Sequence, residues 1–222
     1  MQSILTQSAQ KQIIDEMTKV GVIKNGHWKL TSGRHSNIYV QKDEILPNPT
    51  LFQIVSNALI NTAKFMETNL NYCGFNCYCG FNCVTGPAAA ALPWATIVAL
   101  ALGKPLVYPE KQIDQNKNKI MEFSRGFPKH IKNKRVLIVE DIITTGRSVT
   151  QTMNAIRANE GITTAILSIW NRNSWQVTSS SVLNYTLINS TIESWEANEC
   201  PLCKTGSSLY DPKTGNIIKG DK

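Results

Sequence analysis

The residues best suited to chemistry lie in the segment 136–149, VLIVEDIITTGRSV. Four apolar residues predict a buried strand, and Glu140 and Asp141 stand at its C-terminal end, before a Thr-Thr-Gly turn and a predicted helix. In open α/β sheets, ligands bind at the carboxyl ends of the strands. A turn that enters a helix there presents backbone N–H groups to an anion.

The turn and the two carboxylates together could hold a phosphate beside a sugar. Gly146 gives the turn backbone freedom, and carboxylates accept hydrogen bonds from the vicinal hydroxyls of a ribose. Hydroxyl donors for the phosphate come from Thr144, Thr145 and Ser148. The segment therefore predicts a site for a ribose phosphate.

Strands and helices alternate around this segment. Short apolar strands are predicted at 83–85, 106–108, 136–139, 164–169 and 183–188. Helices are predicted at 6–20, from Asn48 and Pro49 onward, at 88–102 and at 148–160. This alternation predicts an α/β fold with a doubly wound, mostly parallel sheet flanked by helices.

Three regions are expected along the 222 residues. Residues 1–47 form an N-terminal helix and a small Gly-rich hood of short strands and turns. Residues 48–190 form the α/β core. Residues 191–222 form a loop-rich C-terminal tail that contains a CPLC turn.

The net charge of +7 suits polyanionic partners, although a generally basic proteome would explain it equally well. No run of five or six basic residues and no helix-turn-helix pattern is present, so no nucleic-acid partner is expected. The apolar stretch 84–103 is interrupted by Gly86, Pro87 and Pro93, which favours a buried helix over a membrane span. No secretory signal is recognised, which favours a cytoplasmic location and no membrane association.

The six cysteines are expected to be reduced thiols. Four lie in the tandem repeat YCGFNC-YCGFNC at 72–83, whose spacing fits zinc sites poorly. The remaining pair, Cys200 and Cys203, supplies only two ligands. We therefore predict a short sequence duplication and a structural turn, with no metal held by protein ligands.

Several segments resemble one family. The 136–149 segment resembles the phosphoribosyl pyrophosphate motif of type I phosphoribosyltransferases. The segment 21–40, GVIKNGHWKLTSGRHSNIYV, resembles the hood of the orotate phosphoribosyltransferase family. TGPA at 85–88 resembles the family's pyrophosphate loop, and IWNR at 169–172 falls where the family has a strand that ends in Asp-Arg. MEFSRGF at 121–127 and CPLCKTG at 200–206 resemble segments of the short bacterial and archaeal members.

The resemblance implies transfer of the 5-phosphoribosyl group from phosphoribosyl pyrophosphate to orotate, with Mg²⁺ bound through the substrate, in a cytoplasmic homodimer of the pyrimidine pathway. It implies that Glu140 and Asp141 hold the ribose hydroxyls and that the 5-phosphate is bound by Thr144, Thr145, Gly146, Arg147 and Ser148. It further implies that Gly86, Pro87 and Ala88 border the pyrophosphate.

On the base side, the resemblance implies that Arg172 pairs with the orotate carboxylate while Ser32 and Arg34 close the site. A mobile basic loop at 110–127, with Lys111 in a catalytic role, would cover the reactants. Each of these cations could instead be an ordinary surface charge.

Two other functions stay open from the sequence. A binding protein that senses phosphoribosyl pyrophosphate or nucleotides without turnover is favoured by the alanines at 89–91, where the family usually has Gly or Lys. A phosphoribosyltransferase for another base is the second.

Overall fold

The computed structural model describes residues 3–30, 32–69, 80–173, 175–177, 182–212 and 214–218. By its internal contacts the chain divides into two compact units. We call them the core unit, Met1–Gln10 with Gln53–Ser190, and the hood unit, Lys11–Phe52 with Thr191–Lys222. The first eight residues of the tandem cysteine repeat lie outside the described residues.

The core unit contains a parallel four-stranded sheet in the order β3-β6-β7-β8. Its strands are β3 (Cys83–Thr85), β6 (Arg135–Ile143), β7 (Ile162–Asn171) and β8 (Leu183–Asn189). The predicted strand at 106–108 is only a parallel bridge between Leu106 and Val84 at the β3 edge. The predicted α/β class and parallel sheet are confirmed.

Strand β6 is longer than its sequence suggested. Residues Val136–Val139 are completely buried, as an apolar central strand requires. The strand was predicted to end there, but it pairs with β7 as far as Ile143. Glu140 and Asp141 therefore lie within the strand, because backbone pairing with β7 continues past the apolar run that marked the strand in the sequence.

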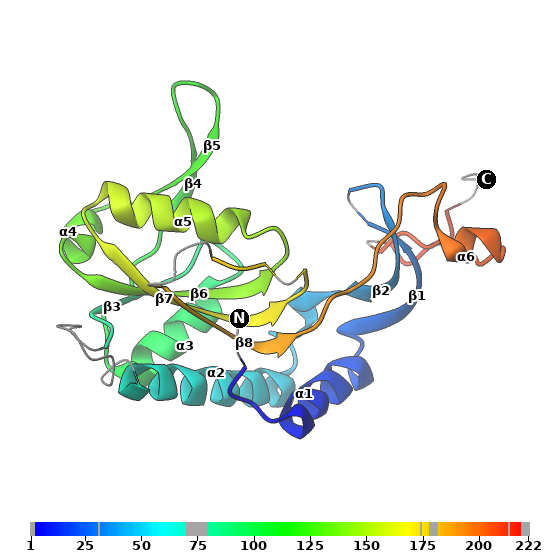
Figure 1. The fold of residues 1–222 in the computed structure, drawn as a ribbon, viewed down its shortest axis with the longest axis horizontal. Helices are drawn as coiled ribbons and strands as arrows, with labels where there is room; N and C mark the ends of the chain where they lie inside the picture. Colours follow the sequence, from blue (N-terminus) through cyan, green and yellow to red (C-terminus); the bar gives the residue numbers. More distant parts are fainter. Residues whose placement is uncertain are drawn as a thin grey trace. The chain divides into compact units, whose positions relative to one another are not determined.

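Helices cover both faces of the sheet: α5 (Arg147–Ala158) lies on one face, and α3 (Leu92–Leu102) and α2 (Pro49–Asn69) lie on the other (Figure 1). As predicted, Asn48 caps α2, since its Oδ1 accepts the amide of Leu51 at 2.9 Å. Helix α3 begins four residues later than predicted, and Gly103 ends it with a φ of 60°. A short helix, α4 (Pro128–Ile131), also lies in the core unit.

A β-hairpin stands where the sequence suggested a mobile loop. Strands β4 (Glu110–Ile113) and β5 (Lys119–Glu122) pair antiparallel and project from the α5 side of the sheet (Figure 1). The turn is held by Asp114, whose Oδ1 accepts the amides of Asn116 and Asn118 at 2.9 and 2.8 Å. The hydrogen bond from the Asn118 amide lowers the pKa of the Asp114 carboxyl.

The hood unit is built on the antiparallel pair β1 (Ile23–Lys29) and β2 (His35–Val40), with a short 3-10 turn, η1 (Lys42–Glu44). Helix α1 (Gln7–Lys19) precedes β1, and α6 (Pro201–Lys204) lies in the tail. The tail pairs with both strands, at Tyr210 beside β1 and at Trp195 beside β2. The tail is therefore an integral part of this unit.

Among the described residues, none of the helices combines the length and hydrophobicity that a membrane crossing requires. The apolar stretch 84–103 forms β3, a turn and α3, as predicted.

Candidate active site

A small cavity opens at the C-terminal end of β6. It has a volume of about 150 Å³ and is lined by Glu140 and by the consecutive residues from Ile142 to Val149. Of the two carboxylates that the sequence grouped with the Thr-Thr-Gly turn, Glu140 thus shares a cavity with it. A sugar hydroxyl and a phosphate could occupy it together.

The turn joins β6 directly to the first turn of α5. Gly146 precedes the helix with a left-handed φ of 70° and has no side chain that could cap it. The backbone N–H groups in the first turn of this 12-residue helix have no partners within the helix, and they lie at the cavity together with the positive end of the helix dipole. Thr144, Thr145, Arg147 and Ser148 line the same cavity. This arrangement favours an anion.

Gly146 is required by space as well as by its φ. A Cβ placed there would lie 2.0 Å from Nε1 of Trp175, so the indole edge rests directly on this glycine. Trp175 is held in turn by Asn171 at the end of β7. The side-chain oxygen of Asn171 accepts the backbone N–H of Trp175 at 3.1 Å, and the side-chain nitrogen of Asn171 donates to the backbone carbonyl of Trp175 at 3.0 Å. The asparagine thus fixes the segment that packs on the turn.

The two acidic residues are buried to the same extent but have different surroundings. Glu140 and Asp141 are each 5% exposed, and only Glu140 lines the cavity. Oδ1 of Asp141 accepts the amide of Ile142, and Oε1 of Glu140 accepts the amide of Asp141 at 3.1 Å. The sequence placed Asp141 at the end of the strand, but β6 continues past it to Ile143 and keeps it buried within the sheet.

The loop after β3 lies beside this end of the sheet. A Cβ on Gly86 would lie 2.9 Å from the Val139 carbonyl oxygen and 3.1 Å from Cβ of Ala95, so close strand–helix packing requires glycine. Pro87 is buried and Ala88 is half-buried. In the alanine run that follows, Ala89 is exposed and Ala91 is completely buried in the core.

Arg172 directly follows β7 and is half-buried. Its amide donates to the carbonyl of Ile143 at 2.9 Å, which ties it to the end of β6. The backbone of Arg172 is therefore close to the start of the 144–148 turn.

The predicted covering cations lie on or beside the β4–β5 hairpin. Lys111 is exposed on β4, opposite Met121 of β5. Arg125 pairs with Glu110 at the base of the hairpin, with Nη2 3.1 Å from Oε1. The hairpin is joined to α5 where the Gln151 side chain donates to the Lys119 carbonyl.

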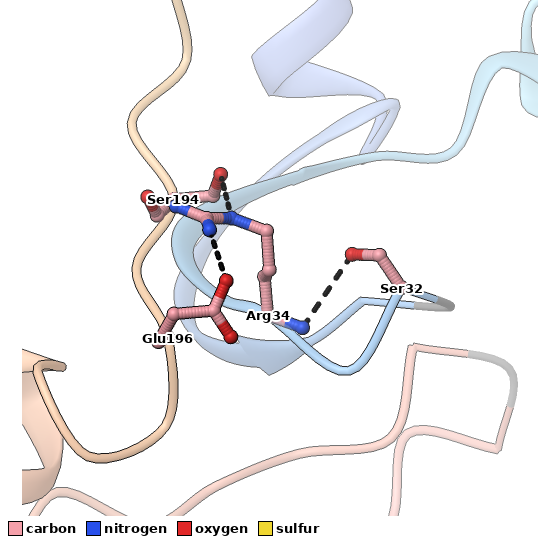
Figure 2. Close-up of polar contacts among 4 residues, drawn as sticks. All are labelled: Ser32, Arg34, Ser194 and Glu196. Carbon is pink, nitrogen blue, oxygen red and sulfur yellow. Dashed lines mark hydrogen bonds and ion pairs between the residues drawn. The ribbon is translucent and has the colours of Figure 1, made fainter.

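The remaining predicted residues, Ser32 and Arg34, belong to the hood unit. The Arg34 guanidinium is directed at the tail, where Nε donates to Ser194 Oγ at 3.0 Å and Nη1 pairs with Glu196 (Figure 2). Ser32 Oγ accepts the Arg34 amide at 3.4 Å (Figure 2). Arg34 therefore has partners within its own unit.

Comparison with known proteins agrees with this geometry. Residues 43–201 match the phosphoribosyl transferase domain. The orotate phosphoribosyltransferase of Thermoanaerobacter sp. (strain X514) is 31% identical over 204 residues, covering 91% of this chain and 96% of that protein.

Two solved structures have a similar fold. The orotate phosphoribosyltransferase from Aeropyrum pernix gives a TM-score of 0.60 at 22% identity, over 80% of this chain and 93% of that one. The adenine phosphoribosyltransferase from Trypanosoma brucei gives 0.57 at 14% identity, over 83% and 82%. The class that the fold and the site define is thus that of the phosphoribosyltransferases, and the chain belongs to this family, in its orotate phosphoribosyltransferase branch.

Sequence reasoning missed the contribution of Trp175 and Asn171 to the site. Asn171 stands where the family pattern has an acidic residue, and its reciprocal hydrogen bonds explain how an amide serves there. An amide both donates and accepts, whereas a carboxylate only accepts. Trp175 carried no periodic or motif signal that would have identified it.

Proposed function

We propose that this protein transfers the 5-phosphoribosyl group from phosphoribosyl pyrophosphate to orotate, giving orotidine 5-phosphate and pyrophosphate. The observation that carries the proposal is the shared cavity of Glu140 and the 144–148 turn at the end of β6. The sequence identity of 31% to an orotate phosphoribosyltransferase, over 91% of this chain, supports orotate as the base.

In the proposed reaction, the turn binds the 5-phosphate through its amides and the hydroxyls of Thr144, Thr145 and Ser148, with Arg147 adding positive charge. Glu140 accepts hydrogen bonds from the ribose hydroxyls that face the cavity. Asp141 would accept a hydrogen bond from the same ribose. Its carboxylate also accepts the Ile142 amide, which holds the local geometry of the strand. The anchored sugar can then develop oxocarbenium character at C1.

The leaving pyrophosphate is proposed to lie along the Gly86–Pro87–Ala88 loop. Within and after this loop, Pro87 has no N–H and the Ala88 amide donates to the Pro109 carbonyl at 3.4 Å, while Ala89 is exposed and Ala91 is buried in the core. Lys111 on the hairpin would neutralise charge on the departing group when the hairpin approaches. Water exclusion by that movement would protect the reactive sugar.

Magnesium fits the oxygen chemistry of the cavity. Among the described residues, no group of three or more acidic, histidine or cysteine ligands converges here, and we propose that substrate oxygens and water supply most of the ligands. Glu140 is the cavity carboxylate able to contact the ion or its waters. Mg²⁺ would offset the negative charge that accumulates on pyrophosphate.

On the base side, we propose that the Arg172 guanidinium pairs with the orotate carboxylate, a bidentate match that a lysine cannot provide. Ser32 and Arg34 would close this side, with Arg34 held by Ser194 and Glu196. We also propose a homodimer and a cytoplasmic location, both of which are typical of this family.

The test is turnover. Wild-type protein with orotate, phosphoribosyl pyrophosphate and Mg²⁺ should show loss of orotate absorbance and stoichiometric pyrophosphate. Glu140→Gln should lower kcat by about 100-fold or more, the scale seen when a transition-state contact is removed. Glu160→Gln, which changes an exposed residue beyond the opposite end of α5, is the matched control and should keep full activity.

Other outcomes separate the alternatives. Turnover with a purine or uracil but not with orotate would reassign the base. Tight calorimetric binding of phosphoribosyl pyrophosphate without turnover on any base would replace the enzyme with a binding protein.

A further inference from the structure

Four side chains that could bind a metal converge inside the hood unit. They are His27 on β1, His35 on β2, and Cys200 and Cys203 at α6. One potential ligand atom from each lies within 4.8 Å of all the others. The first three residues are buried and Cys203 is partly exposed. We propose that these residues bind a structural Zn²⁺ ion, a role independent of the proposed transferase activity.

The spacing of the ligand atoms matches tetrahedral zinc. From Zn–N and Zn–S bond lengths, a tetrahedral ion separates its ligands by roughly 3.3 Å for two nitrogens, 3.6 Å for nitrogen and sulfur, and 3.8 Å for two sulfurs. Nε2 of His27 lies 3.1 Å from Nδ1 of His35, 3.4 Å from Sγ of Cys200 and 3.7 Å from Sγ of Cys203. Nδ1 of His35 lies 3.2 Å from Sγ of Cys203.

The hydrogen bond of the second ring nitrogen of His27 sets the tautomer that a metal ligand needs. Nδ1 lies 3.0 Å from the carbonyl oxygen of Ser207, and a carbonyl only accepts, so Nδ1 must carry the proton. In the neutral tautomer that carries this proton, Nε2 presents its lone pair to the cluster. A ligating histidine commonly donates its other N–H to a carbonyl in this way.

Backbone hydrogen bonds position the segments that carry the ligands. In the β1–β2 ladder, Gly26 and His27 oppose the single residue Asn37, which makes a β-bulge at the first ligand. The amide and carbonyl of His35 pair with those of Trp195, both at 2.8 Å. The amide of Tyr210 donates to the His27 carbonyl at 2.8 Å, so the tail is tied to the hairpin on both sides of the cysteine pair.

The proposed ion would connect two segments that are remote in sequence. A compact unit of under about 80 residues rarely gains enough stability from its apolar core alone, and a bound metal is a common supplement. Four protein ligands leave no open position, which is the structural kind of zinc site. An adjoining cavity of about 940 Å³, lined in part by His27, His35 and Cys203, gives the ion access from solvent.

The test begins with the 222-residue chain, purified without a histidine tag in reducing buffer. Elemental analysis should find one zinc per chain. Chelator-treated protein reloaded with Co²⁺ should show the strong visible bands of tetrahedral cobalt and a near-ultraviolet thiolate-to-cobalt band. Hydrogen exchange should show faster exchange in 23–40 and 195–211 after chelation, with β6 unchanged.

Variants locate the ion. Cys203→Ser and His35→Gln should lose most of the bound metal and the thiolate band should weaken in Cys203→Ser. His130→Gln and Cys83→Ala are the matched controls, since neither residue belongs to the cluster, and both should retain one zinc per chain. Wild-type protein with much less than one zinc and no tetrahedral cobalt spectrum would overturn the proposal, as would a Cys200–Cys203 disulfide in the freshly purified chain.

Discussion

Replacing Gly146 by alanine would test whether the packed turn and its left-handed backbone form the phosphate site. At φ 70° a Cβ costs about 1–2 kcal/mol. That Cβ would also lie 2.0 Å from Nε1 of Trp175, so the indole must move, which adds about 1–3 kcal/mol as an overpacking cost. We expect Gly146→Ala to lose about 2–5 kcal/mol of unfolding free energy and at least tenfold in affinity for phosphoribosyl pyrophosphate.

Gly103→Ala is the matched control. Gly103 has a similar φ of 60°, but a Cβ there would meet nothing within 4 Å. This variant should lose only the backbone cost of about 1–2 kcal/mol and keep full ligand affinity. Gly146→Ala made in a Trp175→Ala background should also cost only that amount, because the clash is gone.

The assays are urea unfolding and calorimetric titration with phosphoribosyl pyrophosphate and Mg²⁺. If Gly146→Ala and Gly103→Ala destabilise the protein equally, and neither changes affinity, the reasoning about the packed turn is refuted. An equal cost of Gly146→Ala with and without Trp175 would show that the indole does not rest on the turn.

Three further predictions concern other parts of the chain. Arg172→Ala should raise KM for orotate by about 10- to 100-fold, the worth of a charge-assisted hydrogen bond, with a smaller effect on phosphoribosyl pyrophosphate; equal effects would remove Arg172 from the base side. Glu196→Ala should change unfolding free energy by less than about 1 kcal/mol, because its pair with Arg34 is exposed, but should raise KM for orotate about two- to fivefold; an unchanged KM would remove Arg34 from the base side. Burial raises the pKa of the Cys83 thiol from 9.0 to about 11, so the unfolded chain releases this proton first. The contribution of this thiol to the unfolding free energy is therefore complete below pH 9 and is lost as the pH rises through about 11. Urea unfolding should show a loss on the order of 2 kcal/mol over this range. A Cys83→Ala variant with the same decline would contradict this assignment.

Local patterns were sufficient for the elements that carry a strong periodic or capping signal. Strand β3 was predicted with its exact bounds, and Asn48 was correctly identified as the cap of α2. The cavity beneath the Thr-Thr-Gly turn followed from the rule that ligands bind at the carboxyl ends of parallel strands. These features depend on residues that are neighbours in sequence.

Features that depend on remote partners could not be predicted. The end of β6 is decided by its pairing with β7, so the burial of Asp141 was missed. The hairpin at 110–122 lacked strand-like alternation, and its order comes from the Asp114 turn and from packing of β5 on α5. The CPLC pair provided only two ligands, because the histidines that join it are some 170 residues away.

We propose that the cavity at the end of β6 holds a ribose 5-phosphate, and a crystal structure with bound orotidine 5-phosphate is the decisive measurement. The phosphate should lie within hydrogen-bond distance of amides in the 144–148 turn, and a ribose hydroxyl should contact Glu140. A nucleotide bound elsewhere, with that cavity closed, would contradict it.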